Sequence, residues 1–369
     1  MTWQTKKLGD IIKLEYGKPL PDSQRKAKGA YPVYGANGEK DRTDEYYFDK
    51  PSIIVGRKGS AGEINFTENK FWPLDVTYFV VHDEKNYNLK FLYNILLTLE
   101  LPKLAKGVKP GINRNEVYNI EVKIPSLPEQ HRIVAILDKA FAAIAKAKEN
   151  AKKNLKNVRE IFESYLNQIF MQRGERWVEK KVSEIAKHSL GKMLDKAKNK
   201  GEPRSYLRNI NVRWFTFDLS DLLQMPFLPA EKEKYTAIKG DVLICEGGYP
   251  GRAAIWDEDY PIYFQKALHR VRFHQPEHSK WFVYYLSVQD SSGQLKKCFS
   301  GTGIQHFTGE ALARFTIPIP PLLEVRRAVA KFDELSEQTQ RLESLYQQKL
   351  AALDELKKSI LHKAFSGEL

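Results

Sequence analysis

The stretch PSLPEQHRIVAILD, residues 125–138, occurs a second time as PPLLEVRRAVAKFD, residues 320–333. The spacing of 195 residues between the two (125 against 320) continues without a gap to the ends of the segments that follow them. There LKNVREIFESYLNQIF (155–170) faces LAALDELKKSILHKAF (350–365). A match of this length at one constant spacing indicates an internal repeat.

The beginnings of the two halves repeat as well. WQTKKLGDI (3–11) corresponds to WVEKKVSEI (177–185), 174 residues later (3 against 177), and GKPL (17–20) corresponds to GKML (191–194) at the same spacing. The chain is therefore a duplication, in which each half has a body followed by a tail. The second body is 21 residues longer than the first, because the spacing grows from 174 to 195 between the start of the body and its tail.

Each tail follows a proline-rich hinge, where proline ends a strand and admits a helix start. In the first tail, apolar residues recur every three or four positions, at Val134, Leu137, Phe141, Ile144, Ala151, Leu155, Val158, Phe162, Tyr165 and Ile169. The second tail has a looser series, at Phe332, Leu335, Leu342, Tyr346, Leu350, Leu353, Leu356 and Ile360. This spacing predicts two long helices that pack on each other, antiparallel, as a coiled coil.

The bodies contain short β-branched and aromatic runs between Gly, Pro and Asn turns, such as SIIVG (52–56) and DVLIC (241–245). Two further segments, 88–107 and 278–298, have helical patterns at equivalent places in the two halves. We therefore expect an α+β fold with two mixed α/β bodies that contain many short strands, two long antiparallel helices between them and a pseudo-twofold duplication. The expected domains are residues 1–125, the helix 126–173, residues 174–320 and the helix 321–369.

The composition limits the classes of function. The net charge of +13 at pH 7 suits a polyanionic partner, most often nucleic acid, although a lysine-rich solvated surface has the same composition. The two cysteines, Cys245 and Cys298, form no zinc-binding spacing, so we expect no metal site. The chain has no apolar run of about 18 residues and no signal-peptide pattern, so we expect a cytoplasmic protein without a membrane partner.

A glycine-rich motif occurs in both bodies. IIVGRKGSAGEI (53–64) aligns with LICEGGYPGRAAI (243–255). A phosphate-binding loop requires a strand, then glycines, then a helix, whereas both copies here are followed by another strand pattern. The motif therefore predicts a strand–turn–strand hairpin. Two alternatives remain open: a purely structural turn, or a hairpin held against DNA with Arg57, Lys58, Ser60, Tyr249 and Arg252 at its edge.

A second pair of motifs lies before the hinges. It contains GVKPGINR (107–114) in the first half and GTGIQH (301–306) in the second. Amide side chains read adenine edges, and arginine reads guanine or holds phosphate. The same side chains also cap turns, so both interpretations are kept for Asn113, Arg114, Gln305 and His306.

Taken together in this order, these motifs resemble the specificity (S) subunit of type I restriction-modification systems. The resemblance rests on KLGDI and GKPLP, YPVYGANG (31–38), VGRKGSAG, GVKPGIN, and the helix start PSLPEQHRI, and it extends over the whole chain. The second half departs from it in two ways: it has no sequence like YPVYGANG, and its helix start lacks the glutamine.

The resemblance implies a non-catalytic subunit that binds double-stranded DNA at a split, asymmetric site. Each body would read one half of the site, and the helices would set the gap and dock methyltransferase (M) and restriction (R) subunits. No cofactor is expected on this chain; S-adenosylmethionine would bind to the methyltransferase, and ATP and Mg to a restriction subunit. The expected DNA contacts are Tyr34, Lys40, Arg42, Arg57, Lys58, Ser60, Lys109, Asn113, Arg114, Lys192, Arg204, Arg208, Arg213, Tyr249, Arg252, Gln305 and His306.

Other functions find less support in the sequence. An adenine methyltransferase would need an Asp/Asn-Pro-Pro-aromatic loop, which is absent, and no catalytic residue is expected. Asp75 together with Asp83-Glu84-Lys85 resembles a carboxylate–lysine nuclease pattern only loosely, and the second half does not repeat it. The main alternative is a tandem DNA-binding regulator without enzymatic partners.

Overall fold

The computed structural model of the chain describes residues 3–195 and 197–369. Residues 1 and 2, in the first predicted domain, and residue 196, in the third, lie outside the described residues.

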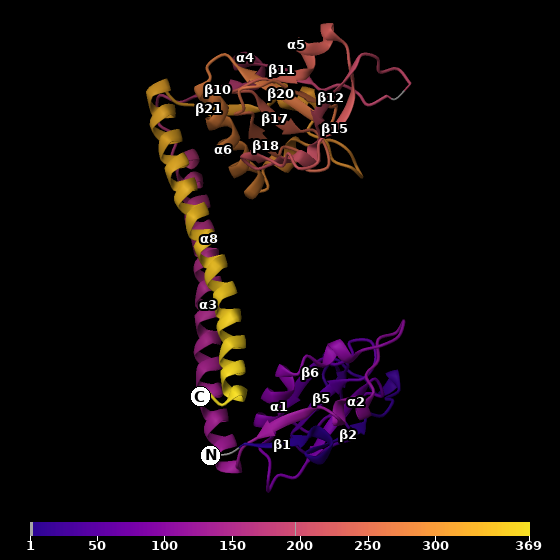
Figure 1. The fold of residues 1–369 in the computed structure, drawn as a ribbon. Helices are drawn as coiled ribbons and strands as arrows, with labels where there is room; N and C mark the ends of the chain where they lie inside the picture. The colour runs from indigo at the N-terminus through magenta and orange to yellow at the C-terminus, as the bar shows by residue number, and fades with distance from the viewer. Residues whose placement is uncertain (1–2, 196) are drawn as a thin grey trace. The chain divides into compact units, whose positions relative to one another are not determined.

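The chain divides into two units, each of which holds one body and part of both long helices (Figure 1). Unit 1 contains residues 1–153 and 347–369, and unit 2 contains residues 154–346. The two long helices are α3 (Leu127–Met171) and α8 (Leu322–Ser366). Both begin within two residues of the predicted hinges, because the prolines before them disfavour a continued strand and are compatible with the first helical turn.

The body of unit 1 is built on three small sheets, with strand orders β1-β9, β2-β8-β5-β6 and β4-β3-β7. The strands are β1 (Gln4–Lys7), β2 (Ile12–Tyr16), β3 (Tyr31–Gly35), β4 (Gly38–Thr43), β5 (Ser52–Gly56), β6 (Ile64–Thr67), β7 (Trp72–Pro73), β8 (Thr77–His82) and β9 (Glu121–Ile124), and the helices are α1 (Leu89–Thr98) and α2 (Arg114–Tyr118).

The body of unit 2 has the strand orders β10-β21, β11-β20-β17-β18, β15-β12-β19-β16 and β13-β14. The strands are β10 (Val178–Lys181), β11 (Ala186–Leu190), β12 (Glu202–Leu207), β13 (Val212–Arg213), β14 (Thr216–Phe217), β15 (Leu223–Phe227), β16 (Thr236–Ala237), β17 (Val242–Cys245), β18 (Ala253–Ile255), β19 (Ile262–Phe264), β20 (Leu268–Phe273) and β21 (Thr316–Ile319), and the helices are α4 (Val182–Ile185), α5 (Lys232–Tyr235), α6 (Glu277–Ser291) and α7 (Gly309–Arg314).

The duplication is also present in the sheets. The order β2-β8-β5-β6 corresponds to β11-β20-β17-β18, and the pair β1-β9 corresponds to β10-β21. The predicted helical segments are α-helical only in their first parts, α1 and α6, and each continues into a 3-10 turn (Leu101–Leu104 and Leu295–Cys298), again at equivalent places. The α+β fold and its internal repeat, predicted from the sequence, are therefore confirmed.

The second half lacks a sequence like YPVYGANG, but it does not lack the strand that this sequence forms in the first half. In unit 1, β3 carries YPVYG and pairs parallel with β7, with Tyr34 opposite Pro73. In unit 2, β12 pairs parallel with β19 in the same way, with Leu207 opposite Phe264. The second body thus has a structural counterpart of this strand, although its sequence is unlike YPVYGANG, because backbone pairing does not require the same side chains.

The glycine of the repeated Gly-Lys pair has a structural cause. A Cβ on Gly17 would lie 2.0 Å from the Leu74 carbonyl oxygen, and one on Gly191 would lie 2.3 Å from the Gln265 carbonyl oxygen. Both neighbours are backbone atoms that have little freedom to move. Glycine is therefore required where the chain leaves β2 and β11.

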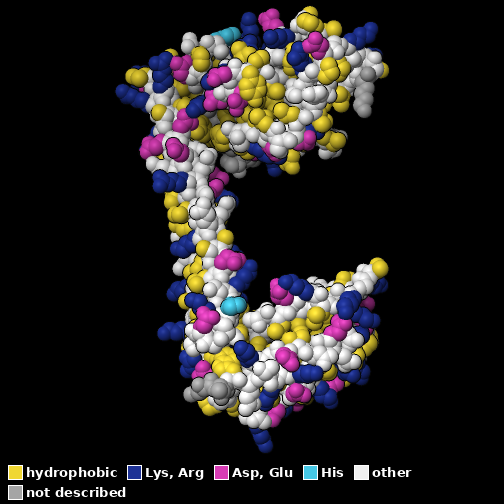
Figure 2. All heavy atoms as spheres, in the orientation of Figure 1, with side chains coloured by type: hydrophobic (Ala, Val, Ile, Leu, Met, Phe, Trp, Pro, Cys, Tyr) yellow, Lys and Arg dark blue, Asp and Glu magenta, His cyan; other side chains and the backbone are white. Residues whose placement is uncertain are grey.

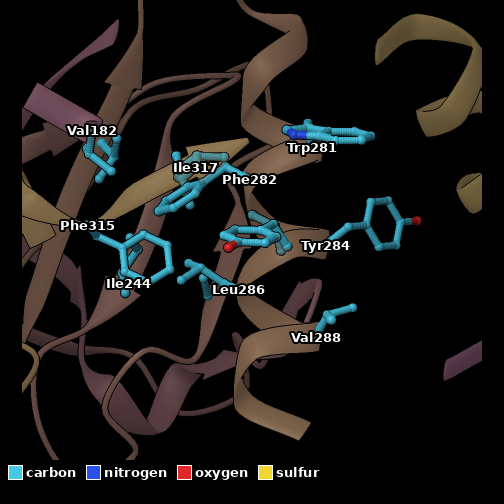
Figure 3. Packing of buried hydrophobic residues seen from close by; sticks show 14 of the residues in the cluster. Val182, Ile244, Trp281, Phe282, Tyr284, Leu286, Val288, Phe315 and Ile317 are labelled. Atoms are coloured by element: carbon cyan, nitrogen blue, oxygen red, sulfur yellow. The ribbon is translucent and has the colours of Figure 1, made fainter. Parts of the chain in front are cut away.

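The core of unit 2 joins the body to the long helices through α6. Figure 3 shows Phe282 and Leu286 directed to one side of α6 and Trp281 and Tyr284 to the other. The Phe282 ring lies 5.2 Å from that of Phe273 in β20. On the other side, Tyr284 donates a hydrogen bond to Asp333 of α8 at 2.9 Å.

In unit 2 the two long helices run side by side in opposite directions (Figure 1). Arg159 of α3 pairs with Glu343 of α8, and, further along α3, the Phe170 ring lies 5.8 Å from that of Phe332. Residue numbers rise along one helix as they fall along the other, so the predicted antiparallel pairing is confirmed here.

The same pairing occurs within unit 1. Lys148 of α3 pairs with Asp354 of α8, and the Lys357 ammonium lies 5.0 Å from the centroid of the Phe141 ring. The predicted seam is only partly covered. Leu342 in unit 2 keeps 40% of its surface exposed and Leu356 in unit 1 keeps 47%, because a pair of helices covers only a narrow strip of each. Within the described residues, no helix is long and apolar enough to cross a membrane.

Candidate nucleic-acid interface

The two glycine-rich motifs of the first half lie next to each other in unit 1. The Gly59 amide donates to the Pro110 carbonyl oxygen at 2.9 Å, and the Ile112 amide donates to the Arg57 carbonyl oxygen at 3.0 Å. The first motif forms the predicted hairpin, since β5 pairs with β6 up to Val55 opposite Ile64. Two motifs about 50 residues apart in the sequence thus form a single edge of the body, named here edge 1 (residues 56–62 and 106–114).

Edge 1 carries two arginines on one tyrosine. The guanidinium groups of Arg57 and Arg114 lie 5.3 Å and 4.9 Å from the centroid of the exposed Tyr16 ring. Arg57 also donates to the Asp75 carbonyl oxygen, from Nε at 3.0 Å and from Nη2 at 2.7 Å. Tyr16 itself packs on Tyr78, with ring centroids 5.1 Å apart. These contacts hold two positive charges in place at a surface that solvent reaches.

Three other predicted residues of edge 1, Lys58, Ser60 and Lys109, are exposed. Asn113 has a structural role, because its side chain accepts a hydrogen bond from the Asn115 amide at 2.9 Å and so caps α2. The capping interpretation of this amide is therefore confirmed, while its contact with a base stays a prediction.

Burial raises the pKa of Tyr78, whose hydroxyl donates to the Ile112 carbonyl oxygen at 3.3 Å.

Unit 2 has the equivalent arrangement, named here edge 2 (residues 246–252 and 300–307). The Phe307 amide donates to the Glu246 carbonyl oxygen at 2.8 Å, and the His306 ring lies so close to Gly247 that an added Cβ would be 3.0 Å from its Nδ1. β17 and β18 form the predicted hairpin, with Ile244 opposite Ala253.

The charged groups of edge 2 differ from those of edge 1. The Arg252 guanidinium lies 4.0 Å from the centroid of the exposed Tyr249 ring and donates to the Asn209 carbonyl oxygen at 3.0 Å. Gln305 is exposed beside the half-buried His306. Edge 2 thus presents one stacked arginine and an amide where edge 1 presents two arginines and lysines.

A buried imidazole lies behind edge 2. His269, in β20, is opposite Leu190, as Tyr78 in β8 is opposite Tyr16 in unit 1. Burial, together with a smaller effect of the neighbouring His188, lowers the pKa of His269 to about 4. The ring is therefore neutral at pH 7 and adds no positive charge behind the hairpin.

The family model for the type I restriction modification DNA specificity domain matches residues 1–156 and, a second time, residues 174–352. The chain belongs to this family. It is similar to a putative type I restriction enzyme specificity subunit of Haemophilus influenzae, with 24% identity over 86% of this chain and 83% of the relative. It is also similar to the EcoDI specificity subunit of Escherichia coli, with 24% identity over 100% of this chain and 88% of that protein.

Solved structures show the same fold. The HsdS subunit from Thermoanaerobacter tengcongensis matches with a TM-score of 0.63 at 18% identity, over 100% of this chain and 97% of that chain. A chain from a structural study of complex assembly and conformational transition in the type I R-M system matches with a TM-score of 0.78 at 17% identity, over 100% and 98%. This protein is thus a type I restriction-modification specificity subunit with two family domains, each ending in a long helix.

Within the specificity subunit, two of the predicted DNA contacts are buried in their domain. Tyr34 packs edge-on against Phe71, with ring centroids 5.8 Å apart. Lys192 is buried, and its ammonium donates to Glu231 Oε2 at 2.6 Å and to the Pro226 carbonyl oxygen at 2.9 Å. Each of the two residues keeps less than a tenth of its surface exposed, because each takes part in the packing of its domain.

The other predicted residues lie away from the two edges or hold internal partners. Arg208 pairs with Asp221 at 2.7 Å, Arg213 with Asp218 at 3.5 Å, and Arg42 with Glu39 at 2.8 Å. Arg204 pairs with Glu202, and the exposed Lys40 lies against Gly35. DNA contact by all of these side chains stays a prediction.

Tyr16, on whose ring the two arginines of edge 1 stack, is a residue that the sequence motifs missed. It follows Leu14 and Glu15 in an ordinary alternating strand, so it carries no local signal. The equivalent residue of unit 2 is Leu190, which has no aromatic ring. This difference between the two halves is the signal that could have identified Tyr16.

The carboxylates of the nuclease-like sequence pattern lie at opposite ends of one strand. Asp75 precedes β8 and Asp83 follows it, so a six-residue strand of roughly 20 Å separates the two carboxylates. Over residues 3–195 and 197–369, no cluster of three or more His, Cys, Asp or Glu side chains is arranged to hold a metal ion. Figure 2 shows Lys and Arg side chains interspersed with Asp and Glu on both units in the face in view, so the net charge of +13 is not gathered into one patch there.

Proposed function

We propose that the subunit reads a split, asymmetric DNA site, with edge 1 against one half and edge 2 against the other. The observation that supports this most directly is the pair of equivalent hairpin edges with different side chains. Arg57 and Arg114 mark edge 1, whereas Tyr249 and Gln305 mark edge 2. Two edges that share one backbone arrangement but carry different side chains would recognise two different half-sites.

The partners in this proposal are methyltransferase subunits that dock on the long helices, with restriction subunits joining them. Exposed aliphatic side chains on the helices support such docking: Ile161 and Leu345 in unit 2, and Leu356 in unit 1. Aliphatic side chains left exposed along a helix pair favour further helix packing. In this proposal, adenine methylation and cleavage reside on the partners, which would carry S-adenosylmethionine, ATP and Mg.

The test is genome-wide sequencing of adenine methylation in the source cell, with and without the gene. We expect a motif of two short blocks around a fixed gap to lose its methylation when the gene is removed, and to regain it when the gene returns on a plasmid. Unchanged methylation in a cell whose methyltransferase subunits are expressed would contradict the proposal.

The contribution of edge 1 can be measured through the dependence of binding on salt. Replacing Arg57 and Lys58 together by alanine is expected to weaken DNA binding by the complex with its methyltransferase. The slope of log K against log salt should flatten by about 1–2, at roughly 0.9 for each phosphate group that the variant no longer neutralises.

A matched control removes two positive charges from the other end of the same strands. Lys50 precedes β5 and Lys85 follows β8, whereas Arg57 and Lys58 follow β5 at its opposite end. Both control lysines are exposed, so replacing both by alanine changes the net charge equally without touching edge 1. An equal change of slope in the two double variants would show that edge 1 contributes only through net charge.

A further inference from the structure

Each edge ends in a small hairpin whose tip carries an exposed aliphatic side chain. In edge 1, Lys106 and Gly111 exchange backbone hydrogen bonds at 3.0 Å and enclose residues 107–110. In edge 2, Ser300 and His306 do the same at 2.9 Å and 2.8 Å and enclose residues 301–305. The two tips occupy equivalent positions, between the 3-10 turn that follows α1 or α6 and the short helix α2 or α7.

The tips project the same kind of side chain. Val108 has a relative exposure of 105% and Ile304 one of 74%, which places both among the most exposed large apolar residues of the described chain. A single exposed aliphatic residue needs no explanation. Here, however, the loops differ in length and sequence, and both still place a β-branched aliphatic side chain at the tip. The recurrence indicates a shared role rather than a chance exposure.

The backbone of the tips is shaped for this projection. Gly107 has a φ of +93° and Gly301 a φ of +108°, and a Cβ on Gly301 would lie 2.3 Å from the Ile304 carbonyl oxygen. Glycine therefore makes both tight turns possible. With the chain turned in this way, the described residues of each unit leave the Val108 and Ile304 side chains largely exposed.

Basic residues lie in the segments that form or adjoin both tips. Lys109, next to Val108 in the chain, and Lys58, whose backbone bridges to Gly111 at the base of the tip, are both exposed, and Lys106 pairs with Glu116 at 2.6 Å. In unit 2, Lys296 and Lys297 lie in the turn before the tip, and Arg252 lies on the neighbouring hairpin. Cations around an aliphatic tip suit a phosphate backbone on either side of a groove, whereas an apolar protein surface would leave these charges without partners.

We propose that Val108 and Ile304 enter the groove of the DNA and make apolar contacts with base edges, one in each half-site. This inference rests on the proposed function and specifies two of its base-reading residues. An aliphatic side chain discriminates between bases through contact with the thymine methyl group, and it loses its own exposure to water on binding. The phosphate contacts of the surrounding lysines would position the tip, and the tip would carry sequence information.

The test uses the full-length subunit in complex with its methyltransferase. In Val108→Ser and Ile304→Ser the backbone turn is kept and the apolar group is removed, while Val108→Ile and Ile304→Val keep the apolar group as controls. We expect each serine variant to bind the split site about tenfold more weakly, which corresponds to about 1.4 kcal/mol. The salt slope should not change, because no charge is removed, and the conservative variants should bind within about twofold of wild type.

Methylation sequencing in cells that express each variant assigns the contacts. We expect Val108→Ser to relax the base preference in one block of the motif only, and Ile304→Ser to do so in the other block only. Wild-type preference in both blocks for both serine variants, or a change in both blocks from a single variant, would overturn the inference and leave the proposed function intact. A wild-type complex that methylates no split motif would overturn the proposed function itself, and this inference with it.

Discussion

Replacing Phe332 by alanine is expected to lower the free energy of unfolding of unit 2 by about 3–5 kcal/mol. Phe332 is fully buried in α8, and its ring contacts those of Trp281 and Tyr284 in α6 as well as Phe170 in α3. The helices α3, α6 and α8 all pack on this ring. Its removal therefore leaves a cavity that none of the three helices can fill without losing contact with the other two.

The effect should be confined to unit 2. Urea unfolding followed by tryptophan fluorescence reports mainly on this unit, which holds Trp177, Trp214, Trp256 and Trp281 among the six tryptophans of the chain. Amide hydrogen exchange should show reduced protection in α6 but not in α1 of unit 1. The control is Leu345→Ala on the same helix, at an exposed site, with an expected change within about 0.5 kcal/mol. Equal destabilisation by the two variants would contradict the central role of Phe332.

Replacing Gly62 by alanine is expected to destabilise unit 1 by about 2–5 kcal/mol. The residue has a φ of +86°, at which a side chain costs roughly 1–2 kcal/mol, and overpacking adds about 1–3 kcal/mol. The overpacking follows from the position of the new Cβ, which would lie 2.4 Å from the backbone nitrogen of Pro102 and 2.5 Å from the carbonyl carbon of Leu101. The hairpin of edge 1 would have to move away from the turn after α1.

Gly59, in the same hairpin, separates the two contributions. Its φ of +80° is similar, but a Cβ there would meet no atom within 4 Å. Gly59→Ala should therefore cost only the conformational part, roughly 1–2 kcal/mol. The difference between the two variants, measured by urea unfolding with hydrogen exchange at β5 and α1 as the local readout, gives the cost of the close approach. A Gly62→Ala variant as stable as Gly59→Ala would show that the hairpin moves at little cost.

The candidate edges were partly predictable from the sequence. Both glycine-rich hairpins and their alignment with each other followed from the repeat, because two copies of one pattern identify a shared structural requirement more reliably than a single copy. Arg57, Lys58 and Tyr249 do lie at these edges. The pairing of the first motif with the second was not predictable, because hydrogen bonds such as that from Gly59 to Pro110 join segments about 50 residues apart.

The sequence by itself determined the duplication, the α+β class, the two long helices with their hinge positions, and the family. These depend on repeats and on periods of two and of three to four residues, which are local properties of the chain. The tertiary structure alone decided which polar side chains are available to a partner. Lys192 can be buried because it forms an ion pair with Glu231, 39 residues away. Tyr16 lies against edge 1 because the guanidinium groups of Arg57 and Arg114 both stack on its ring. Exposure is set by what distant segments place over a residue, and no local pattern contains that information.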